Sequence, residues 1–153
     1  MTIIAWDGRI IAADGLVSAG GVITSRNHKK LLVEDNRIFG LAGGLGFMPH
    51  LVHWYKNGAK PGEAPKDTDW TFIVLEGGGV ARCASNTFPY MDSYDPPWAW
   101  GSLWCVAYGA MLAGKTAVEA VEIMCRTDTE CGGEIQAVNI DEVLGVDHKL
   151  AAE

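Results

Sequence analysis

The sequence predicts an α+β domain, and a four-layer αββα sandwich is the most economical arrangement of its elements. Apolar β-prone segments come in pairs joined by short turns, helical periodicity occurs in two separate groups, and an alternating segment follows the second group. Antiparallel strand pairs with segregated helices suit a layered α+β architecture, because each sheet buries a face against another layer. We expect residues 1–153 to form one domain of this kind.

The first strand pair opens the chain. Residues 2–6 are β-prone, Asp7-Gly8 is a strong two-residue hairpin signal, and residues 9–13 return as a second strand. Residues 15–21 are small and predict a loop, and a short strand follows at 22–24.

The middle of the chain predicts a second set of strands around one helix. Pro49 fits a first helical turn, the spacing of Leu51, Val52 and Tyr55 is helical, and Asn57-Gly58 gives a stop. Strands are expected at residues 30–33, 37–42, 70–75 and 80–83, with turns at 34–36 and 77–79 and a solvated connection at 59–69.

The period changes to helical after residue 102. The spacing of the apolar residues predicts a helix that Gly114 ends, and Thr116 with Glu119 forms a capping box that begins a second helix. Residues 85–98 read as irregular, residues 98–101 as a short strand, and residues 134–140 as a final strand.

Composition limits the class of protein. Of the 153 residues, 48% are hydrophobic and 20% charged, and the formal net charge is -7, which disfavours nucleic acid or an anionic membrane as the main partner. No apolar run reaches the length of a membrane span, and the amino terminus lacks a signal-peptide pattern. We therefore expect a cytoplasmic protein.

The cysteines and histidines predict neither a metal site nor a disulfide. No cysteine pair has C-x-x-C spacing, and no histidine pair has metalloprotease spacing. Free thiols and no cofactor are therefore expected. The six tryptophans have two interpretations, packing in the core or at a subunit interface and a substrate-binding wall, and packing is favoured.

Met1-Thr2 carries latent chemistry. If Met1 is removed, Thr2 has a free α-amine and a β-hydroxyl on one residue, which are a base and a nucleophile. An α-amine titrates near pH 8, so much of it is neutral at cellular pH. If Met1 is retained, the amine is part of a peptide bond and no general base remains.

The opening Thr-Ile-Ile-Ala-Trp-Asp-Gly, followed by Ile-Ile-Ala-Ala-Asp-Gly, resembles the amino terminus of proteasome β-type subunits and of the bacterial HslV peptidase. The resemblance places the nucleophile at Thr2 and a supporting acid at Asp14. Lys29-Lys30-Leu31 resembles the segment whose second lysine is catalytic. Phe39-Gly40-Leu41-Ala42-Gly43 resembles the segment whose first glycine supplies the oxyanion-binding amide, which assigns that role to Gly40.

Two later segments resemble the supporting part of the same site. Trp100-Gly101-Ser102 resembles the Gly-Ser that places a serine near the threonine amine, and residues 128–133 resemble an Asp-x-x-Ser-Gly-Gly segment. By resemblance, Ser102 and Asp128 hydrogen-bond around the amine, and Cys131 stands where the family has serine. Leu103 stands where the family commonly has glycine.

The resemblance spans residues 2 to about 140 and implies an Ntn-hydrolase fold and a threonine peptidase of stacked homo-oligomeric rings. Its substrate would be a peptide or unfolded protein, and an unfolding ATPase of the AAA+ class would feed it. Two alternatives stay open at this point. One is a catalytically inactive, proteasome-like structural or assembly protein, of phage origin in one version, and the other is an amidase that acts on a small amide.

Overall fold

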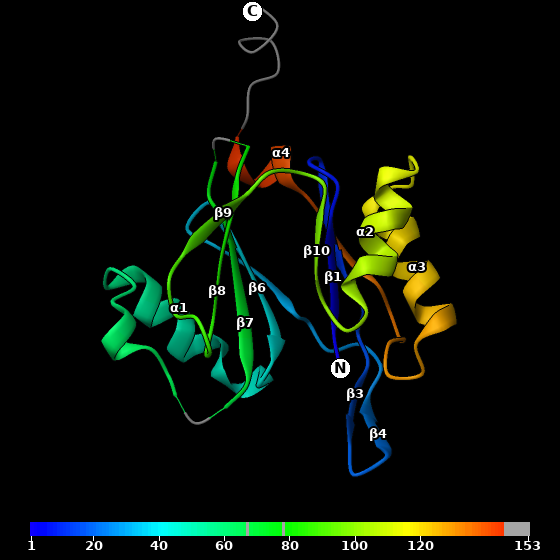
Figure 1. The fold of residues 1–153 in the computed structure, drawn as a ribbon, viewed down its shortest axis with the longest axis horizontal. Coiled ribbons are helices and arrows are strands. Elements are labelled where there is room, and N and C mark those ends of the chain that lie inside the picture. The colour runs from blue at the N-terminus through cyan, green and yellow to red at the C-terminus, as the bar shows by residue number, and fades with distance from the viewer. Residues whose placement is uncertain (67, 78, 146–153) are drawn as a thin grey trace, which may run out of the picture.

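The computed structural model describes residues 1–66, 68–77 and 79–145. It has a mixed α/β architecture in which two antiparallel sheets lie beside each other and helices cover their outer sides (Figure 1). A small hairpin, β3 (Val17–Ala19) with β4 (Val22–Ser25), projects from the end of the molecule where the amino terminus lies.

The first sheet carries both the beginning and the end of the chain. Its order is β10-β1-β2-β11, so the amino-terminal hairpin is flanked on each side by a strand from the carboxyl-terminal half. Its strands are β1 (Ile3–Trp6), β2 (Ile10–Ala13), β10 (Trp98–Gly101) and β11 (Gln136–Asn139).

The Asp7-Gly8 turn forms as its sequence predicts. Gly8 has a φ of +101°, which glycine adopts without steric cost. One Asp7 carboxylate oxygen accepts hydrogen bonds from the amides of Arg9 and Ile10, both at 2.8 Å. The other accepts from the amide of Ala117 at 2.8 Å, so this turn also caps a helix that starts 110 residues later.

The second sheet has the order β5-β6-β7-β8-β9, and all its pairings are antiparallel. Its strands are β5 (Leu31–Glu34), β6 (Arg37–Gly43), β7 (Trp70–Leu75), β8 (Ala81–Ser85) and β9 (Asp92–Tyr94). β5 is therefore an edge strand of the second sheet, as β11 is of the first.

Three apolar clusters hold the elements together. One lies between the two sheets and includes Ile4 and Trp6 from the first and Ile73 from the second. A second packs helices α2 (Trp104–Leu112) and α3 (Ala117–Thr127) on the first sheet. A third packs α1 (Met48–Lys56) on the second sheet. Short 3-10 turns at Leu45–Phe47 and Pro61–Glu63 flank α1.

The predicted elements occur with a few differences. The capping box at Thr116 and Glu119 is confirmed, with hydrogen bonds of 3.0 and 3.2 Å. The expected strand at 134–140 is shorter, because Asn139 accepts from the amide of Asp141 and begins α4 (Ile140–Leu144). The expected loop at 15–21 contains β3, and the expected irregular segment contains β9. Gly78, in the predicted turn at 77–79, lies outside the described residues.

No helix in the described parts of the chain is long and apolar enough to cross a membrane.

Candidate active site

A buried ion pair lies at the amino-terminal end of the first sheet. The Lys30 Nζ is 2.9 Å from Asp14 Oδ1, and the side chains of both residues are fully buried. Lys30 Nζ also donates to the Leu16 carbonyl at 2.9 Å. A buried charge pair is costly unless further hydrogen bonds satisfy it, so this pair is held in a specific geometry.

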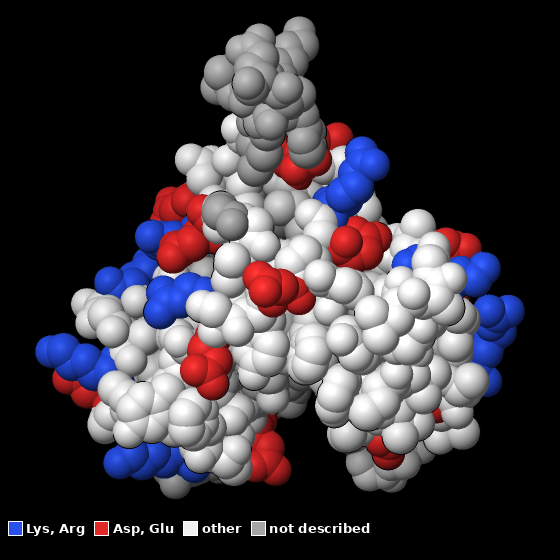
Figure 2. Space-filling view, turned by 45° about the horizontal axis from the view of Figure 1, so that its top comes forward, with Lys and Arg blue, Asp and Glu red and all other residues white. Residues whose placement is uncertain are grey.

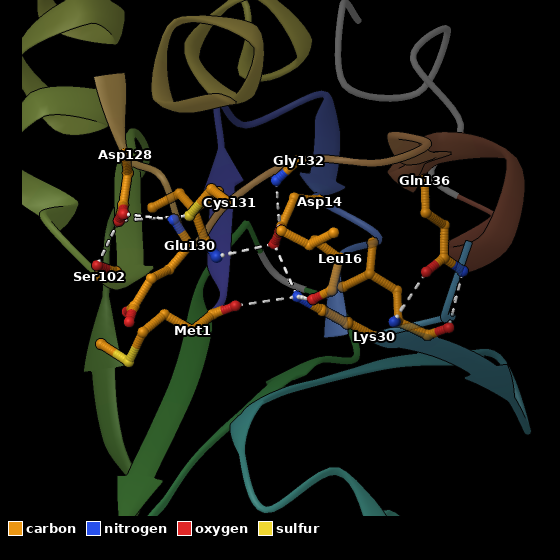
Figure 3. A network of polar contacts seen from close by, with 12 residues as sticks. Met1, Asp14, Leu16, Lys30, Ser102, Asp128, Glu130, Cys131, Gly132 and Gln136 are labelled. Carbon is orange, nitrogen blue, oxygen red and sulfur yellow. Dashed lines mark hydrogen bonds and ion pairs between the residues drawn. The ribbon is translucent and has the colours of Figure 1, made fainter. Parts of the chain in front are cut away.

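The Asp14 carboxylate accepts hydrogen bonds from three parts of the chain. Its Oδ1 accepts from the Ile3 amide at 3.1 Å as well as from Lys30, and its Oδ2 accepts from the Gly132 amide at 3.1 Å (Figure 3). Asp14 stands directly after β2, beside the start of β1. The carboxylate therefore ties the lysine to the residue that follows Thr2.

The backbone on both sides of Thr2 is held by hydrogen bonds from Lys30 and Ser102. The carbonyl of Met1 accepts from Lys30 Nζ at 3.3 Å, and the carbonyl of Thr2 accepts from the Ser102 amide at 2.9 Å. Thr2 is only 5% exposed, although it is the second residue of the chain. Its backbone is thus fixed beside the ammonium group that the sequence predicts as its partner.

Gly101 permits the close approach of the Ser102 segment to Thr2. It has a φ of +113°, and a Cβ on it would lie 1.9 Å from the Thr2 carbonyl oxygen. No other residue fits there without moving Thr2. A glycine is therefore needed at this position for the site to form.

A second polar cluster lies on the other side of Met1 and centres on Asp128 (Figure 3). Asp128 Oδ2 accepts from the Ser102 hydroxyl at 2.6 Å and from the Cys131 thiol at 3.6 Å, and Oδ1 accepts from the Glu130 amide at 2.9 Å. The Ser102 hydrogen bond is the main cause that lowers the pKa of the Asp128 carboxyl, followed by the Glu130 amide. The positive amino terminus also lowers this pKa, so a carboxylate faces the start of the chain.

Cys131 is a thiol donor in this cluster. Burial raises the pKa of the Cys131 thiol, and the carboxylates of Asp14 and Asp128 raise it further. The sulfur therefore stays protonated and donates to Asp128, in place of the serine of the resembled pattern.

Gly40 does not lie at the site that the sequence predicts for it. It sits in the middle of β6, opposite Leu31 and Ile73, and a Cβ on it would lie 3.2 Å from Ile4 Cδ1. The Leu41 amide donates to the Lys30 carbonyl. Since amides alternate along an antiparallel strand, the Gly40 amide points toward β7 and is used inside the sheet. The assignment of the oxyanion amide to Gly40 is therefore wrong.

Gly43 has the geometry that Gly40 lacks. It is two residues after Leu41, so its amide points to the same side as that of Leu41, away from β7 and toward the side of Lys30. It has a φ of +97°, and a Cβ on it would lie 2.4 Å from the Asp69 carbonyl. Together with Thr2 it lines the same cavity.

A cavity of about 880 Å³ opens beside Thr2. One wall comes from the segments 16–18 and 42–43, and another from residues 98–102. Asp69 is the only charged side chain among the described lining residues, and its carboxylate accepts from the Asn86 amide group at 3.1 Å. In the face seen in Figure 2, the surface is hollowed between two lobes whose facing atoms are mostly uncharged.

The tryptophans fall into two groups, one packed in the core and one that also lines the cavity. Trp6 packs in the core and stacks on Trp100, with ring centroids 6.4 Å apart. Trp98 and Trp104 stack at 5.3 Å, and both line the cavity with Trp100. Packing therefore describes Trp6 fully, while the group around β10 also forms a cavity wall.

The described residues contain no group of three or more His, Cys, Asp or Glu side chains arranged to hold a metal ion. His148 lies outside those residues.

No protein-family model matches the chain, and no curated protein matches it. The solved structure of BPH from Thiobacillus denitrificans, in complex with epoxomicin, has a similar fold, with a TM-score of 0.68. The two chains are 18% identical, and the match covers 90% of this chain and 97% of the other. This likeness shows the fold alone. The chain therefore shares the fold of this epoxomicin-bound protein.

Sequence reasoning missed several backbone groups of the site. The amides of Ile3 and Gly132 and the carbonyl of Leu16 carry no side-chain signal, and only the folded chain brings them to Asp14 and Lys30. Gly43 did carry a signal, since it belongs to the same glycine-containing segment as Gly40.

Proposed function

We propose that this protein is an amino-terminal-threonine peptidase that becomes active when Met1 is removed. The observation that carries this proposal is the buried Lys30–Asp14 pair, whose ammonium group contacts the carbonyl preceding Thr2. An ion pair with no exposed surface, placed at a residue with a nucleophilic hydroxyl, is typical of a reactive centre rather than of a solvated surface.

The residues have distinct roles in this reaction. The Thr2 hydroxyl attacks a peptide carbonyl and gives its proton to the free Thr2 amine, which passes a proton to the leaving amine. Water then hydrolyses the Thr2 ester and releases the acyl half of the peptide. Lys30 stabilises the negative charge that develops on the hydroxyl oxygen, and Asp14 holds Lys30 in place.

We assign the oxyanion-binding amide to Gly43. Its orientation toward the side of Lys30 and its place in the cavity support this role. Losing one such donor typically costs about 3 kcal/mol of barrier. Ser102, Asp128 and Cys131 orient the free amine, because the Asp128 carboxylate faces the start of the chain.

The fold supports the same reading. We interpret the order of α1, two facing sheets, and α2 with α3 as a four-layer αββα sandwich of the Ntn-hydrolase type. The protein with the similar fold is bound by epoxomicin, a proteasome inhibitor. Among the described residues, the cavity lining is mostly uncharged, which favours peptides with uncharged, apolar side chains next to the scissile bond.

We further propose a homo-oligomeric ring or stacked rings, fed by an unfolding ATPase. Helix α2 supports the assembly, because its nine residues include no charged side chain while Val106 is 40% and Leu112 is 62% exposed. The four free cysteines fit a reducing compartment such as the cytoplasm.

A threonine-directed peptide epoxyketone tests the peptidase, since the reagent needs both the hydroxyl and the free amine of Thr2. We expect intact mass spectrometry to show loss of Met1 and one adduct on Thr2. The control is the double variant Lys30→Met with Asp14→Asn, which removes the ammonium without leaving a buried charge unpaired. We expect this variant to form the adduct slowly and to cleave no peptide. Cleavage at the wild-type rate would refute the role of Lys30.

The second candidate, an inactive assembly protein, requires that Met1 is retained. With Met1 in place, the Met1 carbonyl accepts a hydrogen bond from the Lys30 ammonium group. The nitrogen of Thr2 is then part of a peptide bond and cannot act as the free amine. Full retention of Met1 in natively expressed protein, with no epoxyketone adduct, would support this candidate over the peptidase.

A further inference from the structure

Gln136 makes a pair of hydrogen bonds that no part of the mechanism above uses. Its Oε1 accepts from the Leu31 amide at 3.0 Å, and its Nε2 donates to the Leu31 carbonyl at 2.8 Å (Figure 3). The two residues are 105 positions apart in the chain. One side-chain amide thus satisfies both backbone groups of a single residue.

The two residues belong to edge strands of different sheets. Leu31 begins β5, at the edge of the second sheet, and Gln136 begins β11, at the edge of the first. An edge strand presents unpaired backbone groups on its outer side. The amide of Gln136 pairs with these groups as a neighbouring strand would, and it thereby links the two sheets at their edges.

This link is adjacent to the buried ion pair. Leu31 directly follows Lys30, and the Lys30 carbonyl accepts from the Leu41 amide at 3.1 Å. The backbone at residues 30–31 is therefore held by β6 on one side and by Gln136 on the other. The strand that carries Gln136 follows Gly132, whose amide binds the other member of the pair, Asp14.

We infer that Gln136 is a positioning residue that sets the place of Lys30 at Thr2. This inference rests on the proposed peptidase function. Gln136 fixes the backbone from which the lysine side chain starts, and Asp14 fixes the end of that side chain. A displacement of about 1 Å in a catalytic group reduces a rate by up to about 100-fold, so the clamp acts on the chemical step and not on substrate binding.

The first test compares Gln136→Met with the control Asn139→Ala in the full chain. Methionine keeps the length of the side chain and removes both hydrogen bonds. Asn139 lies on the same strand, and its side chain caps α4. For cleavage of an apolar fluorogenic peptide, we expect Gln136→Met to lower kcat by about 10-fold to 100-fold with KM unchanged. We expect Asn139→Ala to lower the thermal midpoint but leave kcat unchanged.

The second test uses Gln136→Glu, whose protonated form is an isostere of the amide. A carboxylate cannot donate to the Leu31 carbonyl, whereas the neutral acid can both donate and accept. The ratio of the variant's kcat to the wild-type kcat should therefore rise as pH falls through the pKa of this carboxyl, because the Leu31 carbonyl favours the neutral acid. The same ratio for Gln136→Met should stay constant, because methionine does not titrate.

Hydrogen exchange of the Leu31 amide provides a readout that does not depend on activity. We expect the amide to lose protection in Gln136→Met and to keep it in Asn139→Ala. Lost protection with wild-type kcat would overturn the inference while leaving the peptidase intact. A wild-type protein without Met1 that neither cleaves peptide nor forms an epoxyketone adduct would instead overturn the proposed function.

Discussion

At the scale of single residues, the two carboxylates of the candidate site, Asp14 and Asp128, differ in burial and in hydrogen-bond partners. Asp14 has no exposed surface and accepts from Lys30 and from two backbone amides, so it fixes one cation. Asp128 is less buried and accepts from Ser102 and Cys131, so it faces the solvent side and the start of the chain. Two carboxylates with such different surroundings can serve different roles at one pH.

Ser102→Ala should raise the pKa of the Asp128 carboxyl toward its ordinary value, because the Ser102 hydroxyl is the main cause of its lowering. A lowered carboxyl pKa contributes stability above the ordinary aspartate pKa of about 4, and this contribution is lost as pH falls through the folded pKa. In the variant this contribution should be smaller, and its loss should be complete at a higher pH, because the folded pKa lies closer to the ordinary one.

Carboxyl NMR titration of Asp128 and acid unfolding curves measure this difference. Ser93→Ala, on the exposed face of β9, serves as the control and should leave the titration of Asp128 unchanged. An Asp128 pKa that is equal in the wild type and in Ser102→Ala would contradict the assignment of the hydrogen bond.

At the scale of elements, the start of α2 shows the effect of one unusual residue. Leu103 has a φ of +44° and lies in the left-handed region. This is the position at which the resembled pattern has glycine. Its side chain is 56% exposed, so little packing offsets the backbone strain.

Leu103→Gly should therefore raise the free energy of unfolding by up to about 1 kcal/mol, since relief of the left-handed strain exceeds the entropy cost of glycine. Leu103→Ala is the matched control, because it removes the same side chain but keeps a Cβ at positive φ, and it should give no gain. Chemical denaturation measures both. A variant Leu103→Gly less stable than Leu103→Ala would contradict this prediction, because relief of strain would then not exceed the entropy cost of glycine.

Local signals predicted the elements well, and long-range contacts were beyond them. The Asp7 turn and the Thr116 cap depend on neighbours in the chain, so their residue types alone indicate them. The hydrogen bonds of Gln136 reach a residue 105 positions away, and no local sequence pattern indicates this contact. Gly40 was assigned wrongly because a motif names a glycine but not the direction of its amide. That direction follows from strand register.

At the scale of the whole molecule, the cavity and the uncharged helix face are separate surfaces with separate tests. The cavity lies between the two sheets' ends, beside Thr2. The outer face of α2 exposes apolar side chains, among them Val106 and Leu112. Exposed apolar side chains on a helix without charged residues fit the subunit contact proposed above.

Leu112→Glu should therefore shift the protein toward the mass of a single 16.4 kDa chain, because it places a charge in the proposed contact. Light scattering coupled to size-exclusion chromatography measures the mass. Val33→Glu is the control, since Val33 is 48% exposed on β5 of the other sheet, and it should leave the mass unchanged. A wild-type protein that already runs as a single chain would contradict the assembly.

The strand order of the first sheet also determines when the contacts around Thr2 can form during translation. The amino-terminal hairpin emerges from the ribosome early, but its flanking strands β10 and β11 are made much later. At about 5 to 20 residues per second, the delay is on the order of ten seconds. Throughout that interval Thr2 lacks the Ser102 amide, and Asp14 lacks the Gly132 amide. In a nascent chain, the proposed nucleophile Thr2 therefore lacks these supporting contacts until translation is nearly finished.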